Sequence, residues 1–127
     1  MMLCPACRGP LVALEYNAIE TDYCPACRGV WLDRGELGLL LRGRPDFLPD
    51  WKSPAASKGA RPCPHCTRAM DMQQLAGGVE VDLCARGHGI WLDKDELRAI
   101  IQTQAAPESA EALIGHFSEV FGKGAPL

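Results

Sequence analysis

The chain has 127 residues, 47% of them apolar, and a formal net charge of −3. This apolar content is typical of a globular protein, and the length suffices for one ordinary domain or two small ones. Because the charge is negative and no run of Lys or Arg forms a basic stripe, general nucleic-acid binding through phosphate neutralisation is disfavoured.

Two C-x-x-C turns bracket the first predicted element. They are Cys4-Pro-Ala-Cys7 and Cys24-Pro-Ala-Cys27, and each can deliver two thiolates from one tight knuckle. Between them, β-prone residues 11–16 and 19–23 flank a turn at Asn17, which predicts a β-hairpin. The hairpin leaves the first knuckle and returns the second knuckle beside it.

A short helix is predicted after the second knuckle. Asp33 and Glu36 have the spacing of a capping box, and this role is favoured over a pair of catalytic carboxylates. Apolar residues then recur at helical spacing and give a stripe that can fold back on the hairpin: Leu37, Leu40 and Leu41. Residues 1–43 therefore form the first predicted unit.

A proline-rich linker is predicted over residues 44–61. Proline fixes φ and removes backbone donors, so an extended and fairly stiff segment is expected. Three apolar side chains interrupt the linker, and their packing on a folded unit is favoured over a partner-binding patch: Phe47, Leu48 and Trp51.

Residues 62–103 repeat the first half, with one residue inserted at the hairpin tip. A knuckle, a hairpin over residues 69–75 and 79–83, and a capped helix recur in the same order. The helix has Asp93 and Glu96 at its predicted start. The identical positions are Cys4/Cys63, Pro5/Pro64, Cys7/Cys66, Glu20/Glu80, Asp22/Asp82, Cys24/Cys84, Gly29/Gly89, Trp31/Trp91, Leu32/Leu92, Asp33/Asp93, Glu36/Glu96 and Leu37/Leu97.

The last unit, residues 104–127, contains a predicted amphipathic helix from Pro107 to Gly122. Docking on the rest of the chain and holding a second subunit or a partner groove are equally favoured uses of it. A homo-oligomer through this helix is therefore one expectation. The apolar face consists of Leu113, Ile114, Phe117, Val120 and Phe121.

Seven cysteines cannot pair completely as disulfides within one chain, and their spacing favours a metal. Zinc prefers four nitrogen or sulfur ligands in a tetrahedron. The first predicted site consists of Cys4, Cys7, Cys24 and Cys27. The second consists of Cys63, Cys66, Cys84 and His88.

His88 is the favoured fourth ligand of the second site because Gly87 stands where Cys27 aligns. An imidazole is longer than a thiolate and can reach the same vertex from the next position. The alternatives are His65 within a knuckle, His116 in the tail, and a water molecule. Water would leave an open position, as in catalytic zinc sites.

Metal-dependent folding is expected, because each half of about forty residues has too little apolar surface to fold alone. A zinc site supplies roughly 10–16 kcal/mol of apparent binding energy. No signal peptide or membrane-spanning segment is recognised, so we expect a cytoplasmic protein whose thiols stay reduced.

One tryptophan follows the last ligand in each half. Trp31 and Trp91 are expected to pack over the metal site and hairpin base, in preference to forming a ligand-stacking surface. Iron in a rubredoxin-like site and a redox-active dithiol are the rivals to zinc. The histidine of the second half favours zinc, and no βαβ pattern surrounds either dithiol.

The pattern C-P-x-C, hairpin, second knuckle and then G-V-W-L-D-R-G-E-L at residues 29–37 resembles the small prokaryotic zinc-ribbon family named after transcription factor IIB. Both halves match, over about two thirds of the chain. The resemblance implies a rubredoxin-like ribbon with a following helix and zinc as the ion. It also implies a role in transcription or another macromolecular interaction.

We therefore expect a small metal-stabilised α+β protein. It consists of two zinc ribbons with one zinc ion each, a linker and a C-terminal amphipathic helix. The expected function is that of a non-enzymatic adaptor for a protein or nucleic-acid partner. A rubredoxin-like electron-transfer or dithiol redox protein is the alternative.

Overall fold

The computed structural model describes residues 2–16, 18–43, 57–74 and 80–117. Within them, seven antiparallel strands form one sheet in the order β1-β2-β3-β7-β6-β5-β4. The strands are β1 Val12–Tyr16, β2 Ile19–Tyr23, β3 Val30–Asp33, β4 Ser57–Pro62, β5 Ala69–Gln74, β6 Glu80–Leu83 and β7 Gly89–Leu92. The helices are α1 Glu36–Arg42, α2 Lys94–Gln104 and α3 Pro107–His116.

The predicted hairpins are present in both halves, which confirms the α+β fold class. β1 pairs with β2 up to Tyr16 and Ile19, and β5 pairs with β6 up to Gln74 and Glu80. We call residues 2–43 the first ribbon and residues 57–104 the second ribbon. The second hairpin tip, residues 75–79, lies outside the described residues.

The two ribbons are joined through their central strands. β3 and β7 run antiparallel, and the register places Trp31 opposite Trp91, its own counterpart in the repeat. The flanking glycines make this approach feasible. A Cβ on Gly29 would overlap the indole of Trp91, and a Cβ on Gly89 would overlap the backbone of Leu32. The ribbons therefore share one sheet and are related by an approximate two-fold rotation at this pair.

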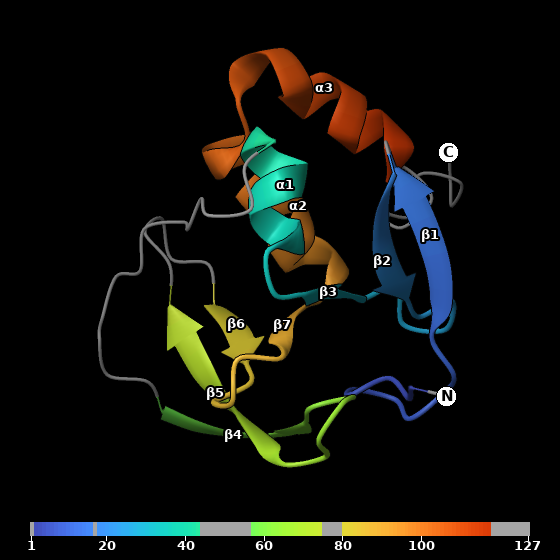
Figure 1. Cartoon of the computed structure of the whole chain (residues 1–127), viewed down its shortest axis with the longest axis vertical. Coiled ribbons are helices and arrows are strands. Elements are labelled where there is room, and N and C mark those ends of the chain that lie inside the picture. Colours follow the sequence, from blue (N-terminus) through green and yellow to red (C-terminus); the bar gives the residue numbers. More distant parts are fainter. Residues whose placement is uncertain (1, 17, 44–56, 75–79, 118–127) are drawn as a thin grey trace.

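The helices gather at one end of the molecule, and the N-terminal knuckle lies toward the other (Figure 1). They enclose an apolar core to which both ribbons contribute, including Leu32, Leu92, Leu41 and Ile101. Burial of these side chains on both ribbons explains why the two halves pack as one body, since neither half has a core of its own at this size.

The C-terminal helix docks on the ribbons. Leu113 and Phe117 are fully buried in the shared core, and the backbone N–H of Ala106 donates to the carbonyl of Leu41 at 3.1 Å. Of the predicted apolar face, Val120 and Phe121 lie outside the described residues, as does the predicted end of the helix at Gly122.

Part of the predicted linker is a strand. Residues 57–62 form β4, which pairs with β5 and extends the second ribbon beyond the pattern of the first. The linker side chains expected to pack on a folded unit, Phe47, Leu48 and Trp51, lie outside the described residues. Across the described ranges, no helix is both long enough and apolar enough to span a bilayer.

The capping prediction is confirmed for the second ribbon and corrected for the first. Asp93 caps α2 in a complete capping box with Glu96. α1 instead begins after Gly35, whose φ of 90° is left-handed, and no side chain caps it. Only the reciprocal half of the box forms there, from the N–H of Asp33 to Glu36 at 2.8 Å. The Asp33 carboxylate has other partners, described below.

Candidate metal centres

The four thiols of the first ribbon converge between its two knuckles. The Sγ atoms of Cys7 and Cys24 are 3.3 Å apart, and those of Cys4 and Cys27 are 3.5 Å apart. Two sulfurs on a tetrahedral zinc with bonds of about 2.3 Å are separated by about 3.8 Å. A disulfide would need about 2.0 Å, so these are free thiols arranged for a shared ion.

The second ribbon brings together three thiols and one imidazole. Cys66 and Cys84 have Sγ atoms 3.7 Å apart. Nδ1 of His88 lies 3.3 Å from Sγ of Cys84 and 3.8 Å from Sγ of Cys63. In both ribbons the four ligand atoms all lie within 4.8 Å of one another, so the two sets suit two zinc ions.

The geometry of the fourth knuckle explains how histidine replaces cysteine. In the other three, the residue after the second cysteine is left-handed, and its N–H donates to the carbonyl of the first cysteine: Arg8, Arg28 and Thr67. In the fourth, Gly87 is left-handed and its N–H closes the turn on Cys84 one residue earlier. The shorter turn leaves His88 next in the chain, and its longer side chain fills the vertex.

The other two histidines lie outside the metal clusters. His65 is part of a knuckle, but its Nε2 lies 2.9 Å from Oδ1 of Asp33 on the first ribbon. His116 is on α3, with its ring 4.6 Å from that of Phe117. The fourth position of the second cluster is therefore occupied by His88, and a water ligand is not required to complete it.

The thiols show why a cation is needed. Burial raises the pKa of Cys4 to about 12 and that of Cys63 to about 11. A hydrogen bond from the backbone N–H of Arg68 lowers the pKa of Cys66 to about 6. At Cys24 burial acts upward, but hydrogen bonds led by the Cys27 N–H outweigh it and lower the pKa to about 7. Each cluster thus ionises unevenly, and a divalent ion lets the remaining thiols release their protons.

Backbone N–H groups surround the buried sulfurs. Sγ of Cys4 lies 3.3 Å from the N–H of Ala6 and 3.4 Å from that of Cys7. Sγ of Cys63 lies 3.3 Å from the N–H of His65. Such donors orient the thiolates and offset part of the negative charge that a zinc–thiolate cluster carries.

Both tryptophans are fully buried and pack among the cysteines, as predicted. Trp31 Nε1 donates to Oδ1 of Asp33 at 2.8 Å, the same oxygen that His65 contacts. Trp91 Nε1 has no partner among the described residues, and Asp93 instead caps α2. The sequence analysis missed the contact between His65 of the second ribbon and Asp33 of the first. The signal was present, since His65 is the only histidine within a C-x-x-C turn.

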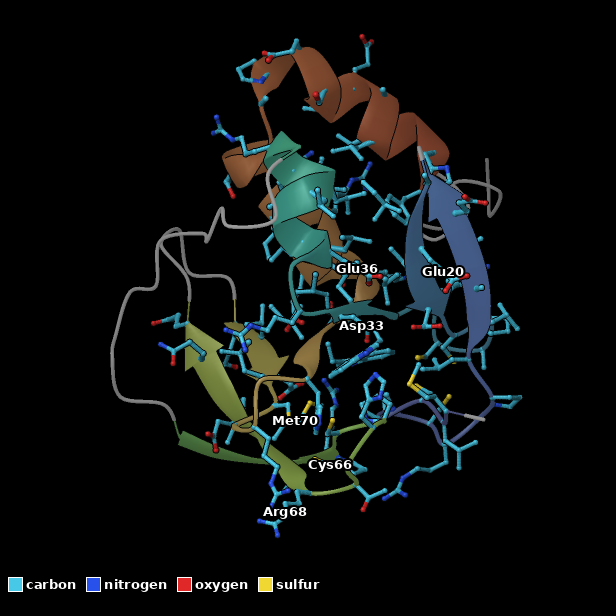
Figure 2. All side chains as sticks on the ribbon, viewed as in Figure 1. Glu20, Asp33, Glu36, Cys66, Arg68 and Met70 are labelled. Carbon is cyan, nitrogen blue, oxygen red and sulfur yellow. The ribbon has the colours of Figure 1, made fainter. Side chains whose placement is uncertain are left out.

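Each ribbon has a partly buried glutamate in the first turn of its helix, Glu36 in α1 and Glu96 in α2. In the first ribbon, burial raises the pKa of Glu36 to about 7, and the neighbouring charges of Asp33, Asp22 and Glu20 act in the same direction. Figure 2 shows Asp33 between Glu36, the first residue of α1, and the knuckle residue Cys66. Glu20, Asp22, Asp33 and Glu36 are each identical to their counterparts in the second half, and the sequence analysis interpreted only Asp33 and Glu36, as a helix cap.

In the second ribbon, the equivalent acidic residues have the cation Arg61 beside them. Burial raises the pKa of Glu96 to about 7. Arg61, on β4, places Nη1 3.1 Å from Oδ2 of Asp82, which is buried. The sequence analysis assigned Arg61 to the linker and missed this pair, because the contact depends on β4 joining the sheet.

The chain matches the family described as transcription factor zinc-finger twice, over residues 3–43 and over residues 62–103. Each matched region contains one complete ligand cluster. No curated protein and no solved structure matches the chain.

Proposed function

The chain belongs to the transcription factor zinc-finger family, and from this membership we propose that it is a non-enzymatic adaptor for a transcription-related protein or nucleic-acid partner. The observation that carries the proposal is that both clusters are closed. Each supplies four protein ligands from two knuckles. Structural zinc sites have this arrangement, whereas catalytic sites keep one position for water or substrate.

The adaptor role is supported by what the zinc ions do for the fold. A zinc ion in each cluster would tie the two knuckles of that ribbon together, and the shared apolar core packs the two ribbons against each other in the described residues. Free thiols in this number suit a reducing compartment, so we place the protein in the cytoplasm.

The knuckle end offers a surface to an anionic partner. Arg8, Arg68 and Arg86 are exposed there, and no acidic residue occurs within the four knuckle turns. Figure 2 shows Arg68 beyond Cys66, on the side away from the helices. Exposed arginines in a rigid frame can contact phosphates or acidic protein side chains.

Two measurements test this function. Native mass spectrometry with metal analysis should find two zinc ions in a colourless chain without redox activity, whereas iron or one metal per chain would contradict it. Crosslinking in the native cell should then capture a component of the transcription machinery with the intact protein. The matched variant Arg8→Glu, with Arg98→Glu on α2 as control, should reduce capture. A chain that captures no such component would remove the support for the adaptor role.

A further inference from the structure

A groove lies between the first knuckle of one ribbon and the first knuckle of the other. Its volume is about 240 Å³, and both halves line it, with Leu3 and Arg8 on the first wall and Pro62, Pro64 and Thr67 on the second. Figure 1 shows the turn that follows β4 beside the N-terminal knuckle. Because the two walls belong to different ribbons, their spacing depends on the β3–β7 pairing that joins the ribbons.

The knuckle turns fix the two walls. The N–H of Arg8 donates to the carbonyl of Cys4 at 2.9 Å, and the N–H of Thr67 donates to that of Cys63 at 2.8 Å. Both cysteines line the groove and are fully buried members of the two ligand clusters. A zinc ion in each cluster would hold these cysteines in place. An occupant therefore has little ordering to impose on the walls, which lowers the free-energy cost of binding.

The lining is largely apolar and has room for one large side chain. Leu3 lies on the first wall, and the partly buried Pro62 and Pro64 lie on the second. A cavity of about 150 Å³ is enough for a benzene ring, so an aromatic side chain fits this groove. Single aromatic or aliphatic anchors in such pockets carry much of the binding energy at protein interfaces.

Arg8 gives the groove a positive charge. Its side chain is exposed and makes no hydrogen bond or ion pair within the described residues, and none of the lining residues is acidic. Each of the four knuckle turns has one arginine and no acidic residue, although the whole chain has a net charge of −3. These arginines outweigh the charge left on the loaded clusters, because two Zn²⁺ ions cancel four of the seven thiolate charges. The groove is therefore complementary to an anionic group.

The cation is on one wall only. In the repeat, Arg8 aligns with Thr67 and Leu3 aligns with Pro62, so the second wall has no charge to match the first. A carboxylate of an occupant would be drawn to the first wall, and its apolar neighbour would contact the prolines of the second. This asymmetry gives the occupant one preferred direction across the groove.

A peptide fits these features better than a nucleic acid. Bases of single strands stack on exposed aromatic rings. The Trp, Phe and Tyr side chains that the structure describes are buried or partly buried, and they are Trp31, Trp91, Phe117 and Tyr23. Tight binding of a phosphate backbone also needs several cations along its path, whereas one arginine lines the groove.

We propose that this groove docks a short acidic segment of a partner protein. An Asp or Glu of the segment pairs with Arg8, and a neighbouring large apolar side chain enters between Leu3 and the prolines of the second wall. A guanidinium can bind a carboxylate through two parallel hydrogen bonds, which fixes the direction of the segment. This inference rests on the adaptor function and names the part of the partner that is recognised.

A synthetic peptide of sequence Gly-Glu-Glu-Phe-Glu-Gly tests the groove with the zinc-loaded full chain. Fluorescence anisotropy of the labelled peptide should show saturable binding. In ¹H–¹⁵N NMR spectra, the amide signals of residues 4–8 and 63–67 should shift, while those of α2 should not. A peptide with Ala in place of Phe should bind at least about tenfold more weakly, because the buried apolar surface is lost.

Variants of the chain separate the ion pair from general attraction. Arg8→Glu should weaken peptide binding by at least about tenfold, because repulsion replaces attraction at the first wall. Arg98→Glu makes the same charge change on α2 and should leave binding unchanged. Thr67→Arg supplies the cation that the second wall lacks and should tighten binding a few-fold. Native mass spectrometry that finds two zinc ions in each variant shows that the variants are folded.

Several outcomes would overturn the docking groove. They are absence of saturable binding, equal affinity for the Phe and Ala peptides, and amide shifts centred on other residues. An oligonucleotide that binds more tightly than the peptide and shifts the same amides would assign the groove to nucleic acid. Peptide binding that appears only after residues 44–51 are replaced by Gly and Ser would assign it to the chain's own linker.

Failure of the groove and failure of the adaptor function give different results. A transcription component captured equally by wild type and Arg8→Glu would leave the adaptor function standing and refute the groove alone. A chain that binds the peptide as expected but captures no such component would support the groove and remove the assigned role in transcription.

Discussion

Loss of the first zinc site should unfold both ribbons. Cys27→Ala removes one of the four ligands of that site while leaving the second cluster chemically complete. In a chain of independent ribbons, the second would keep its zinc and its structure. In this structure, β3 pairs with β7, and Val30, Leu32 and Leu37 of the first ribbon pack in one core with Leu92 of the second.

The magnitudes decide the outcome. A structural zinc site contributes roughly 10–16 kcal/mol of apparent binding energy, whereas the whole free energy of unfolding of a small domain is about 5–15 kcal/mol. The free energy lost with one zinc site therefore matches or exceeds the whole free energy of unfolding of two ribbons that share one core. Both ribbons of the Cys27→Ala variant should therefore be unfolded when one zinc ion is supplied for each site.

Hydrogen exchange and native mass spectrometry measure this directly. The expected result is loss of protection in β5, β6 and β7 together with loss of both zinc ions at low metal concentration. Ala26→Ser, in the same knuckle and exposed, is the matched control and should retain both ions. A Cys27→Ala chain that holds one zinc, with β6 and β7 still protected, would refute a single cooperative body.

The remaining predictions concern single side chains. His88→Cys should keep two zinc ions and His88→Ala one or none, as counted by native mass spectrometry, because only the first restores a donor next to Cys84. Gly89→Ala should lower stability by at least about 1–3 kcal/mol in thermal unfolding, because its Cβ overlaps the Leu32 carbonyl. Gly115→Ala is the control and should not lower stability, because its added Cβ enters open space. Glu96→Gln should stabilise the fold increasingly between about pH 5 and about pH 8.

The sign for Glu96 follows from proton binding. Burial raises its pKa to about 7, so the folded state keeps the proton at pH values where the unfolded chain has released it. The folded state then binds more protons, and stability falls as the pH rises from the ordinary glutamate pKa of 4.5 through about 7. Glutamine keeps the acceptor for the Asp93 N–H without this loss. A Tm difference between variant and parent that does not change with pH would contradict the assignment.

Much of the architecture was predictable because zinc ligation and hairpin turns are local. Two C-x-x-C turns joined by a hairpin must bring their sulfurs together, so the first cluster could be predicted from spacing alone. His88 was predicted because the repeat showed a missing cysteine one residue before it. The structure adds the reason, which is the earlier closure of the turn at Gly87.

Cap geometry was predictable in one ribbon only. Asp33 and Asp93 have the same local sequence signal, but Asp33 accepts a hydrogen bond from Trp31 and is contacted by His65 of the other ribbon. A partner from the distant half of the chain changed its role. Local patterns cannot reveal such competition, since they contain no information on which side chains meet across the sheet.

The sequence by itself determined the ligands, the hairpins and the duplication, because these depend on residues close in the chain or on the fixed tetrahedral demand of the ion. Only the tertiary structure decided that β3 and β7 join the ribbons into one sheet and that Arg61 belongs to the second ribbon. Those features arise from burial shared between distant segments, and each half carries the same signals whether it packs against the other or not.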